Sequence, residues 1–364
     1  MKKNRISRRK FIGTATAAAI GSSLFGFRNA KGNSHSAHSV KDVVSIVSVK
    51  DKNVTQAVEE AIELLGGIKN VTKGKESILL KPNLVEPGRN ATTKVEVVEA
   101  IARLLKKEGK HVMIGEGSAA APSYNVTGEE VFRTKKREIL DGMQKHVFDV
   151  LGYTEMARSL DIPLINLHSG DIVEVALKNG LAANSVKIHS QLVDADLICS
   201  VPMMKTHVLA TVTLAMKNLI GLYPGTEYYS VRSWLHDRAA EKGSTGVAYE
   251  VLDMNRAVKT GLSIIDATSA MEGDGPSSGT LVDMGLIVAG TSPLATDMVG
   301  SALMGFDTSE IPAIKLAHEL GLKPVSMESI EIRGLQILQC RRQFVRPNIY
   351  RWTDINQMWG VREI

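Results

Sequence analysis

The chain of 364 residues has 44 basic and 39 acidic residues, a formal net charge of +5, and only two cysteines, which exclude a disulfide framework and a cysteine-ligated iron–sulfur cluster. Residues 1–30 hold seven of the basic residues and no acidic one, so the rest of the chain carries 37 basic against 39 acidic residues, a formal charge of −2. The overall basicity therefore gives no support for nucleic-acid binding by the folded part.

The first thirty residues predict export. Arg8 and Arg9 form the twin-arginine motif Ser-Arg-Arg-Lys-Phe at residues 7–11, which precedes a mildly apolar stretch at residues 12–27. That stretch is interrupted by small and polar residues, whereas a membrane span needs about 20 strongly apolar ones. We expect a twin-arginine signal peptide over residues 1–30, recognised by the Tat translocase, and a periplasmic or otherwise extracytoplasmic product. The alternatives are a permanent membrane anchor and an ordinary basic N-terminus.

The remainder predicts an α/β fold. Residues 31–42 are small and polar and predict a linker. Short Val- and Ile-rich runs then alternate with helical patterns, which is typical of parallel strands covered by helices. We expect a largely parallel, helix-covered open sheet with long inserted loops, as one large domain or two unequal lobes, over residues 43–335. A C-terminal extension follows at residues 336–364.

The individual elements are predicted from the same patterns. The expected strands are residues 43–49, 77–80, 111–114, 195–201, 262–265 and 284–289. The expected helices are residues 53–65, 95–107 and 298–303. Residues 117–140 and 223–249 are polar with little periodicity, which predicts long loops that act as lids or binding elements.

Polar residues follow five of the expected strands at the point where each ends. In open α/β sheets, ligands bind outside the carboxyl ends of the strands. The residues at these positions are Lys81 and Asn83, Gly115 to Gly117, Lys205 and His207, Asp266 with Asp274, and Asp297. Each alone is weak evidence, because a lysine after a strand is usually solvated and a Gly-Asp-Gly run is usually a turn. Five on one edge predict a single site.

The residue types predict an anionic ligand. Lysine and asparagine side chains supply cationic and amide donors, and the glycine-rich turns at residues 115–117 and 273–275 would expose backbone N–H groups to a phosphate or carboxylate. The expected substrate-binding residues are Lys81, Asn83, Gly115, Gly117, Lys217 and Asn218. The alternative for Lys217 is a solvated helix end.

Three carboxylates leave the cofactor open. Asp266, Asp274 and Asp297 supply hard oxygen ligands of the kind that hold Mg²⁺ or Mn²⁺. They could equally pair with the lysines of the same cleft.

Lys205 and His207 are the expected catalytic residues. An unperturbed histidine titrates near neutrality, so His207 on a loop beside Lys205 suits proton transfer. A structural or solvated histidine is the alternative. His236 lies in the long polar stretch and would enter the site if that segment closes. The chain has no Gly-x-Gly-x-x-Gly turn, Walker loop, Gly-x-Ser-x-Gly elbow or His-Glu-x-x-His motif, which disfavours the enzyme classes built on them.

The combination of these segments resembles the bacterial and archaeal family called domain of unknown function 362. The segments that carry the resemblance span roughly residues 75–305, and they are Lys81-Pro82-Asn83, Lys205-Thr206-His207, Met216-Lys217-Asn218 with Gly221, Asp266 with Gly273-Asp274-Gly275-Pro276, and Ser292-Pro293 with Asp297. Many relatives carry a ferredoxin-like module with iron–sulfur clusters, which implies a redox role. This chain lacks the cysteines for such clusters, so that role is not carried over.

Together these features predict an exported soluble enzyme that acts on a small anionic substrate, with a divalent metal if the carboxylates converge. One alternative is a non-catalytic periplasmic binding protein for an anionic ligand or metal complex. Another is a cofactor-free subunit of an exported redox complex.

Overall fold

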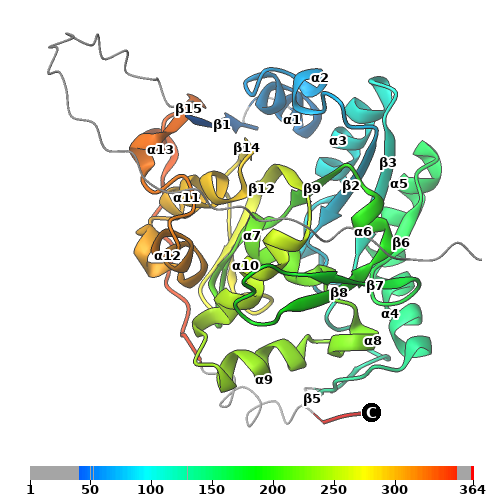
Figure 1. The fold of residues 1–364 in the computed structure, drawn as a ribbon. Coiled ribbons are helices and arrows are strands. Elements are labelled where there is room, and N and C mark those ends of the chain that lie inside the picture. The colour runs from blue at the N-terminus through cyan, green and yellow to red at the C-terminus, as the bar shows by residue number, and fades with distance from the viewer. Residues whose placement is uncertain (1–40, 50, 52, 129, 351–361) are drawn as a thin grey trace, which may run out of the picture. The chain divides into compact units, whose positions relative to one another are not determined.

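A computed structural model describes residues 41–49, 51, 53–128, 130–350 and 362–364 (Figure 1). Residues 41–364 group into one compact unit. The predicted signal peptide and all but the last two residues of the predicted linker lie outside the described residues. Within the described part of the chain, no helix combines the length and apolar character that a bilayer crossing requires.

The centre of the unit is a mixed sheet of eleven strands. Its main path runs in the order β15-β1-β14-β12-β9-β2-β3-β6. These strands are β15 (Ile330–Gly334), β1 (Asp42–Ser48), β14 (Leu286–Gly290), β12 (Thr260–Glu272), β9 (Leu197–Val201), β2 (Ser77–Pro82), β3 (His111–Glu116) and β6 (Leu164–Asn166). Strands β10 (Met203–His207), β11 (Thr211–Thr213) and β13 (Thr280–Val282) extend it beside β12. Two separate hairpins pair β4 (Val126–Thr127) with β5 (Glu130–Val131) and β7 (Ile172–Ala176) with β8 (Ser185–His189).

Most neighbouring strands of the main path are parallel, which confirms the predicted fold class. The exception is β14, which is antiparallel to both β1 and β12. Its register pairs Gly290 with Ser263 and Leu286 with Ala267, so β14 ends beside the beginning of β12. The residues after β14 therefore leave the sheet beside the amino end of β12, and not at the carboxyl ends of the parallel strands as predicted.

Helices cover both faces of the sheet (Figure 1). In β2, Ile78 and Leu80 belong to one apolar cluster and Leu79 to the other, as the two-residue period of a strand requires. The first cluster is covered by α1 (Val54–Glu63), α3 (Val95–Lys107), α4 (Arg137–Val150) and α5 (Tyr153–Leu160). The second is covered by α6 (Ser190–Asp194), α7 (Ala215–Asn218), α10 (Ala248–Ala257), α11 (Pro293–Leu303) and α12 (Pro312–Glu319). The remaining α-helices of the described residues are α2 (Ile68–Val71), α8 (Gly225–Tyr228), α9 (Ser233–Glu241) and α13 (Ile337–Cys340).

The helix boundaries follow local capping chemistry. Asn53 caps α1 in a capping box with Gln56, and Ser292 caps α11 with Pro293 in its first turn. Helix α3 occupies the predicted range, whereas α11 is longer than the predicted 298–303.

The two predicted long loops contain regular structure. Residues 117–140 include the β4–β5 hairpin and the start of α4, and residues 223–249 include α8 and α9. Helix α9 buries the polar residues Ser233 and His236 together with Leu235 and Ala239. Its buried face therefore lacks the regular spacing of apolar residues from which a helix is predicted.

Candidate functional site

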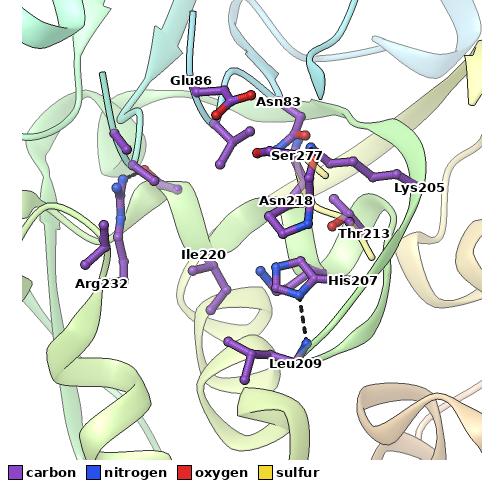
Figure 2. Close-up of a pocket in the computed structure, with 18 of the residues that line it drawn as sticks. Asn83, Glu86, Lys205, His207, Leu209, Thr213, Asn218, Ile220, Arg232 and Ser277 are labelled. Atoms are coloured by element: carbon purple, nitrogen blue, oxygen red, sulfur yellow. Dashed lines mark hydrogen bonds between the residues drawn. The ribbon is translucent and has the colours of Figure 1, made fainter. Parts of the chain in front are cut away.

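A cavity of about 460 Å³ opens where β2, β3 and β10 end (Figure 2). Its wall includes Lys81, Asn83, Glu86, Glu116, Gly117, Lys205, His207, Lys217, Asn218, Arg232, His236 and Asp274. The carboxyl ends of neighbouring parallel strands meet at one edge, which is why segments more than a hundred residues apart converge here.

Lys81 is fully engaged by its neighbours in the wall. Its ammonium lies 2.8 Å from Glu116 Oε1 and donates to Glu116 Oε2 (2.9 Å), the Pro82 carbonyl (2.7 Å) and Asn218 Oδ1 (3.1 Å). Burial lowers the pKa of Lys81, and the neighbouring Glu116 carboxylate opposes that shift. Asn218 in turn donates to the Lys81 carbonyl and to Ser200. Lys81 and Asn218 therefore line the cavity with their polar groups bonded within the wall, and their predicted role in anion binding stays a prediction.

The glycines of the site leave room for neighbouring groups, and their N–H groups do not point to a ligand. A Cβ on Gly221 would lie 2.7 Å from Glu116 Oε1 and 2.8 Å from Lys81 Nζ. The Gly117 N–H donates to Glu116 Oε1 (2.8 Å), and the Gly275 N–H donates to the Gly273 carbonyl (2.9 Å). These N–H groups are already used within the wall, contrary to the prediction that they face the ligand.

Gly115 is not a cavity residue. It lies inside β3, where a Cβ would approach the Leu79 and Leu167 side chains at 3.2 Å. The small residue therefore serves packing in the core, because β3 continues two residues beyond the predicted end.

Lys205 is buried in the cavity wall without a carboxylate in contact. Its strand, β10, is held between β11 and β12, and its Nζ donates to the carbonyls of Ala91 (2.5 Å) and Pro276 (3.1 Å). Burial, reinforced by the charge of Lys217, lowers the pKa of Lys205 to about 7. A large fraction of Lys205 is therefore a neutral amine at neutral pH.

Lys217 is a further amine of the cavity. It lies on α7, and none of the described residues accepts a hydrogen bond from it or forms an ion pair with it. Burial, together with the charges of Arg232 and Lys81, lowers the pKa of Lys217 to about 8. It is still largely protonated at neutral pH and lacks a counterion within the described chain.

His207 is held in one neutral tautomer. The Leu209 N–H donates to His207 Nδ1 at 3.1 Å (Figure 2), so the ring proton lies on Nε2. Burial and the cations Lys217 and Lys205 hold the pKa of His207 well below its usual range. A neutral ring with its proton on Nε2 offers a hydrogen-bond donor and no free basic nitrogen. The predicted acid/base role of His207 stays a prediction, and this geometry favours a neutral donor.

His236 and Arg232 reach the cavity from the segment predicted to be a lid. His236 lies on α9, and burial lowers its pKa to about 3. Arg232 precedes α9 in the left-handed region with φ of 53°, and its guanidinium donates to the carbonyls of Gly117, Ser118, Ser230 and Gly221. Burial lowers its pKa only to about 10, so it stays cationic at neutral pH.

Sequence reasoning missed Arg232, because no local pattern marks its backbone conformation. It is the cavity's third basic group without a carboxylate in contact among the described residues, beside Lys205 and Lys217.

Asp266 lies in the middle of β12, because that strand continues to Glu272 and does not end at Ile265 as predicted. Its carboxylate accepts hydrogen bonds from the Lys94 N–H (2.8 Å) and from the N–H and hydroxyl of Thr268 (3.1 and 2.6 Å). Burial raises the pKa of Asp266 despite these donors.

Asp297 serves as a structural acceptor on α11. It accepts from the N–H groups of Ala215 (2.7 Å) and Met216 (2.9 Å) at the start of α7, and burial raises its pKa to about 7. It thereby positions the helix that carries Lys217.

Asp274 does line the cavity, but its carboxylate accepts from the backbone and side chain of Asn348 (2.8 and 2.9 Å). Asp266, Asp274 and Asp297 thus occupy separate places. Among the residues that the structure describes, no three His, Cys, Asp or Glu side chains gather as metal ligands. The predicted metal set is not assembled.

Two further features shape the cavity. Asn83 Oδ1 is buried with no hydrogen-bond donor among the described residues, which leaves an acceptor for a ligand. The C-terminal extension contributes Tyr350, whose N–H donates to the Val208 carbonyl at 2.9 Å.

The chain matches a protein family over most of its length. The family model described as Domain of unknown function (DUF362) matches residues 78–302. The Thylakoid-associated protein sll1697 of Synechocystis sp. is 29% identical over 270 residues, which is 73% of this chain and 75% of that protein.

Two solved structures are similar at low TM-scores. The lactate racemase apoprotein from Thermoanaerobacterium thermosaccharolyticum has a TM-score of 0.43 and 13% identity, over 75% of this chain and 58% of that one. A protein from Thermotoga maritima has a TM-score of 0.37 and 14% identity, over 73% and 59%. The chain spans less than two thirds of both, and scores this low give no basis for transferring an activity.

Proposed function

The chain belongs to the family described as Domain of unknown function (DUF362), and from that premise we propose that it is an enzyme for a small anionic substrate. In this proposal Lys217 binds the anion directly and Arg232 adds its positive charge, since its terminal N–H groups donate to carbonyls of the wall. The amine of Lys205 is the reacting group, and the His207 Nε2–H donates to a substrate oxygen. A neutral histidine that polarises an oxygen is an established catalytic device. A divalent cation is not part of the proposal, because the candidate carboxylates do not converge.

One observation carries the proposal: three cationic or titratable donors share a cavity in which no described carboxylate contacts them. Lys81 is neutralised by Glu116, and Asp274 is bonded to Asn348. Glu86 lines the cavity and supports the charged form of Lys205, but it is not in ion-pair contact with that amine. A buried excess of positive charge is costly unless an anion compensates it.

Replacing Lys217 with Met should weaken binding of sulfate, a fully ionised probe, by about 10- to 100-fold, since a hydrogen bond to a charged group contributes about 1.5–3 kcal/mol. Titration calorimetry at pH 7 measures the affinity. Lys69→Met, at an exposed position, is the matched control and should bind sulfate as the wild type does. Equal affinities for the Lys217→Met and Lys69→Met variants would remove the anion site from the proposal.

Sulfate affinity should fall as the pH rises through 8. In the free protein the pKa of Lys217 is lowered to about 8, and a bound anion favours the protonated amine and raises that pKa again. Binding therefore takes up protons near pH 8, is strongest below about pH 7, and weakens by up to about tenfold for each pH unit above the free-state pKa. Calorimetry in two buffers of different ionisation enthalpy measures the uptake. A flat affinity from pH 6 to 9 contradicts this assignment.

An enzyme and a binding protein are distinguished by proton transfer. In D₂O, wild-type protein should catalyse exchange of a carbon-bound hydrogen in at least one small carboxylate that it binds, followed by NMR. Lys205→Met should lose this exchange while its sulfate affinity stays within about tenfold of wild type, because Lys217 and Arg232 remain. Tight binding of the whole panel without exchange in any member favours the non-catalytic alternative.

We also propose that the protein is exported by the Tat pathway. The support is the twin-arginine motif at Arg8 and Arg9 and the apolar stretch after it. The relative's name, thylakoid-associated, is compatible with a location outside the cytoplasm. Replacing both arginines with lysine should leave the protein in the cytoplasm of a Tat-competent host, as cell fractionation reports. Unchanged export of that variant, or of wild type in a Tat-deficient host, rules the pathway out.

A further inference from the structure

The two buried lysines of the cavity differ in the number of acceptors around them. A protonated lysine has three N–H donors, whereas the neutral amine has two and a lone pair. Lys81 finds acceptors on Glu116, Pro82 and Asn218, which fits an ammonium group. Lys205 finds two, on Ala91 and Pro276, and both are uncharged carbonyls.

The position of Lys205 suits a nucleophile. One carbonyl comes from the segment before α3 and the other from the turn after β12, and they hold Nζ with its third direction unassigned among the described residues. Figure 2 shows the Lys205 side chain reaching toward Asn83 and Ser277. Lysines become nucleophilic when they are desolvated or lie beside another cation, and both conditions hold here, since Lys205 is buried and Lys217 lines the same cavity.

The neighbours of Lys205 suit attack on a carbonyl group. Lys205 and His207 are two residues apart on β10, so their side chains project from the same face of the strand, and both line the cavity. The His207 Nε2–H is a donor for the oxygen on which negative charge develops during attack. Asn83 Oδ1 is an unused acceptor for the hydroxyl group that follows.

We propose that Lys205 forms an imine with an anionic aldehyde or ketone, such as a 2-oxo acid, bound by Lys217 and attracted by the positive charge of Arg232. This inference rests on the proposed function and names its substrate class. The amine nitrogen attacks the carbonyl carbon to give a carbinolamine. The carbon–oxygen bond then breaks, the C=N bond forms, and both amine hydrogens leave with the oxygen as water. Hydrolysis reverses the step.

Reductive trapping tests the imine. Full-length protein is incubated with glyoxylate and cyanoborohydride at pH 7.5, and each lysine peptide is followed over time by mass spectrometry. A lysine with an ordinary pKa is only about one part in a thousand neutral at this pH, so we expect Lys205 to be modified at least roughly tenfold faster than exposed Lys69. Sulfate should slow the reaction at Lys205 and leave that at Lys69 unchanged.

The Lys205→Met variant should lose this fast modification and keep sulfate binding. If the wild-type protein binds sulfate but modifies Lys205 no faster than Lys69, the imine is overturned and the proposed anion site stands. If sulfate neither binds nor protects and Lys205 reacts no faster than Lys69, both proposals fail.

Discussion

Glu116→Gln is expected to lower the free energy of unfolding by about 3–5 kcal/mol, because it leaves a buried lysine without its counterion. Lys81 is 1% exposed and cannot regain water without moving the strand that carries it. The carboxylate also accepts hydrogen bonds from the N–H groups of Leu84 and Gly117, at 2.8 Å each. Replacing it therefore also weakens hydrogen bonds that hold the backbone of two loops. Denaturant unfolding at pH 6 measures the effect.

An exposed ion pair is the matched control. Glu99 and Arg103 pair at 2.6 Å on the surface of α3, and Glu99→Gln should cost about 0.5 kcal/mol or less. The double change Lys81→Met with Glu116→Gln should recover part of the loss, since no unpaired charge remains buried. If Glu116→Gln lowered the free energy of unfolding as little as Glu99→Gln, water would have to reach Lys81. The buried Lys81–Glu116 ion pair in the cavity wall would then not be formed.

Gly275→Ala is expected to destabilise the protein by about 3 kcal/mol, the upper end of the usual range for overpacking. A Cβ at this position would lie 2.1 Å from the Thr206 carbonyl oxygen, which is backbone and cannot rotate away. Thr206 lies between Lys205 and His207 on β10, whose pairing with β11 and β12 resists displacement. The change should therefore also move the Pro276 carbonyl that accepts from Lys205, and slow the reductive modification of that lysine.

Gly261→Ala separates this effect from a general intolerance of alanine. Gly261 lies in β12, and its added Cβ would meet only the Leu197 side chain, at 3.2 Å. That side chain can shift, so we expect a change within about 1 kcal/mol of wild type. Thermal and denaturant unfolding of the two variants should differ clearly. Equal stabilities would contradict the close contact between residue 275 and β10.

The cavity joins groups whose ionisation states are mutually dependent. Protonated Lys217 lowers the pKa of Lys205 and His207, and Arg232 lowers that of Lys217. Removing any one cation should therefore make its neighbours more basic. Such an arrangement keeps one amine neutral while another stays charged, which is what the division of roles between Lys205 and Lys217 requires.

The sequence by itself determined the fold class, the family and the edge of the sheet that carries the site. Alternating strand and helix patterns identify parallel strands, and parallel strands end at a common edge, where one cavity is lined by Lys81, Glu116 and Lys205. The same rule failed for Asp266 and Asp297. One strand continues past the predicted end and another runs antiparallel, and neither strand length nor strand direction is encoded in a short apolar run.

Only the tertiary structure decided the state of each group. Lys81 and Lys205 are both lysines near strand ends, yet one gains a carboxylate from 35 residues away and the other gains a carbonyl from 114 residues away. The pKa of an amine depends on its burial and on the charges and acceptors that long-range contacts bring to it. Local sequence patterns do not encode those long-range contacts. They therefore predict where the lysines lie along the chain but not the ionisation state of each amine.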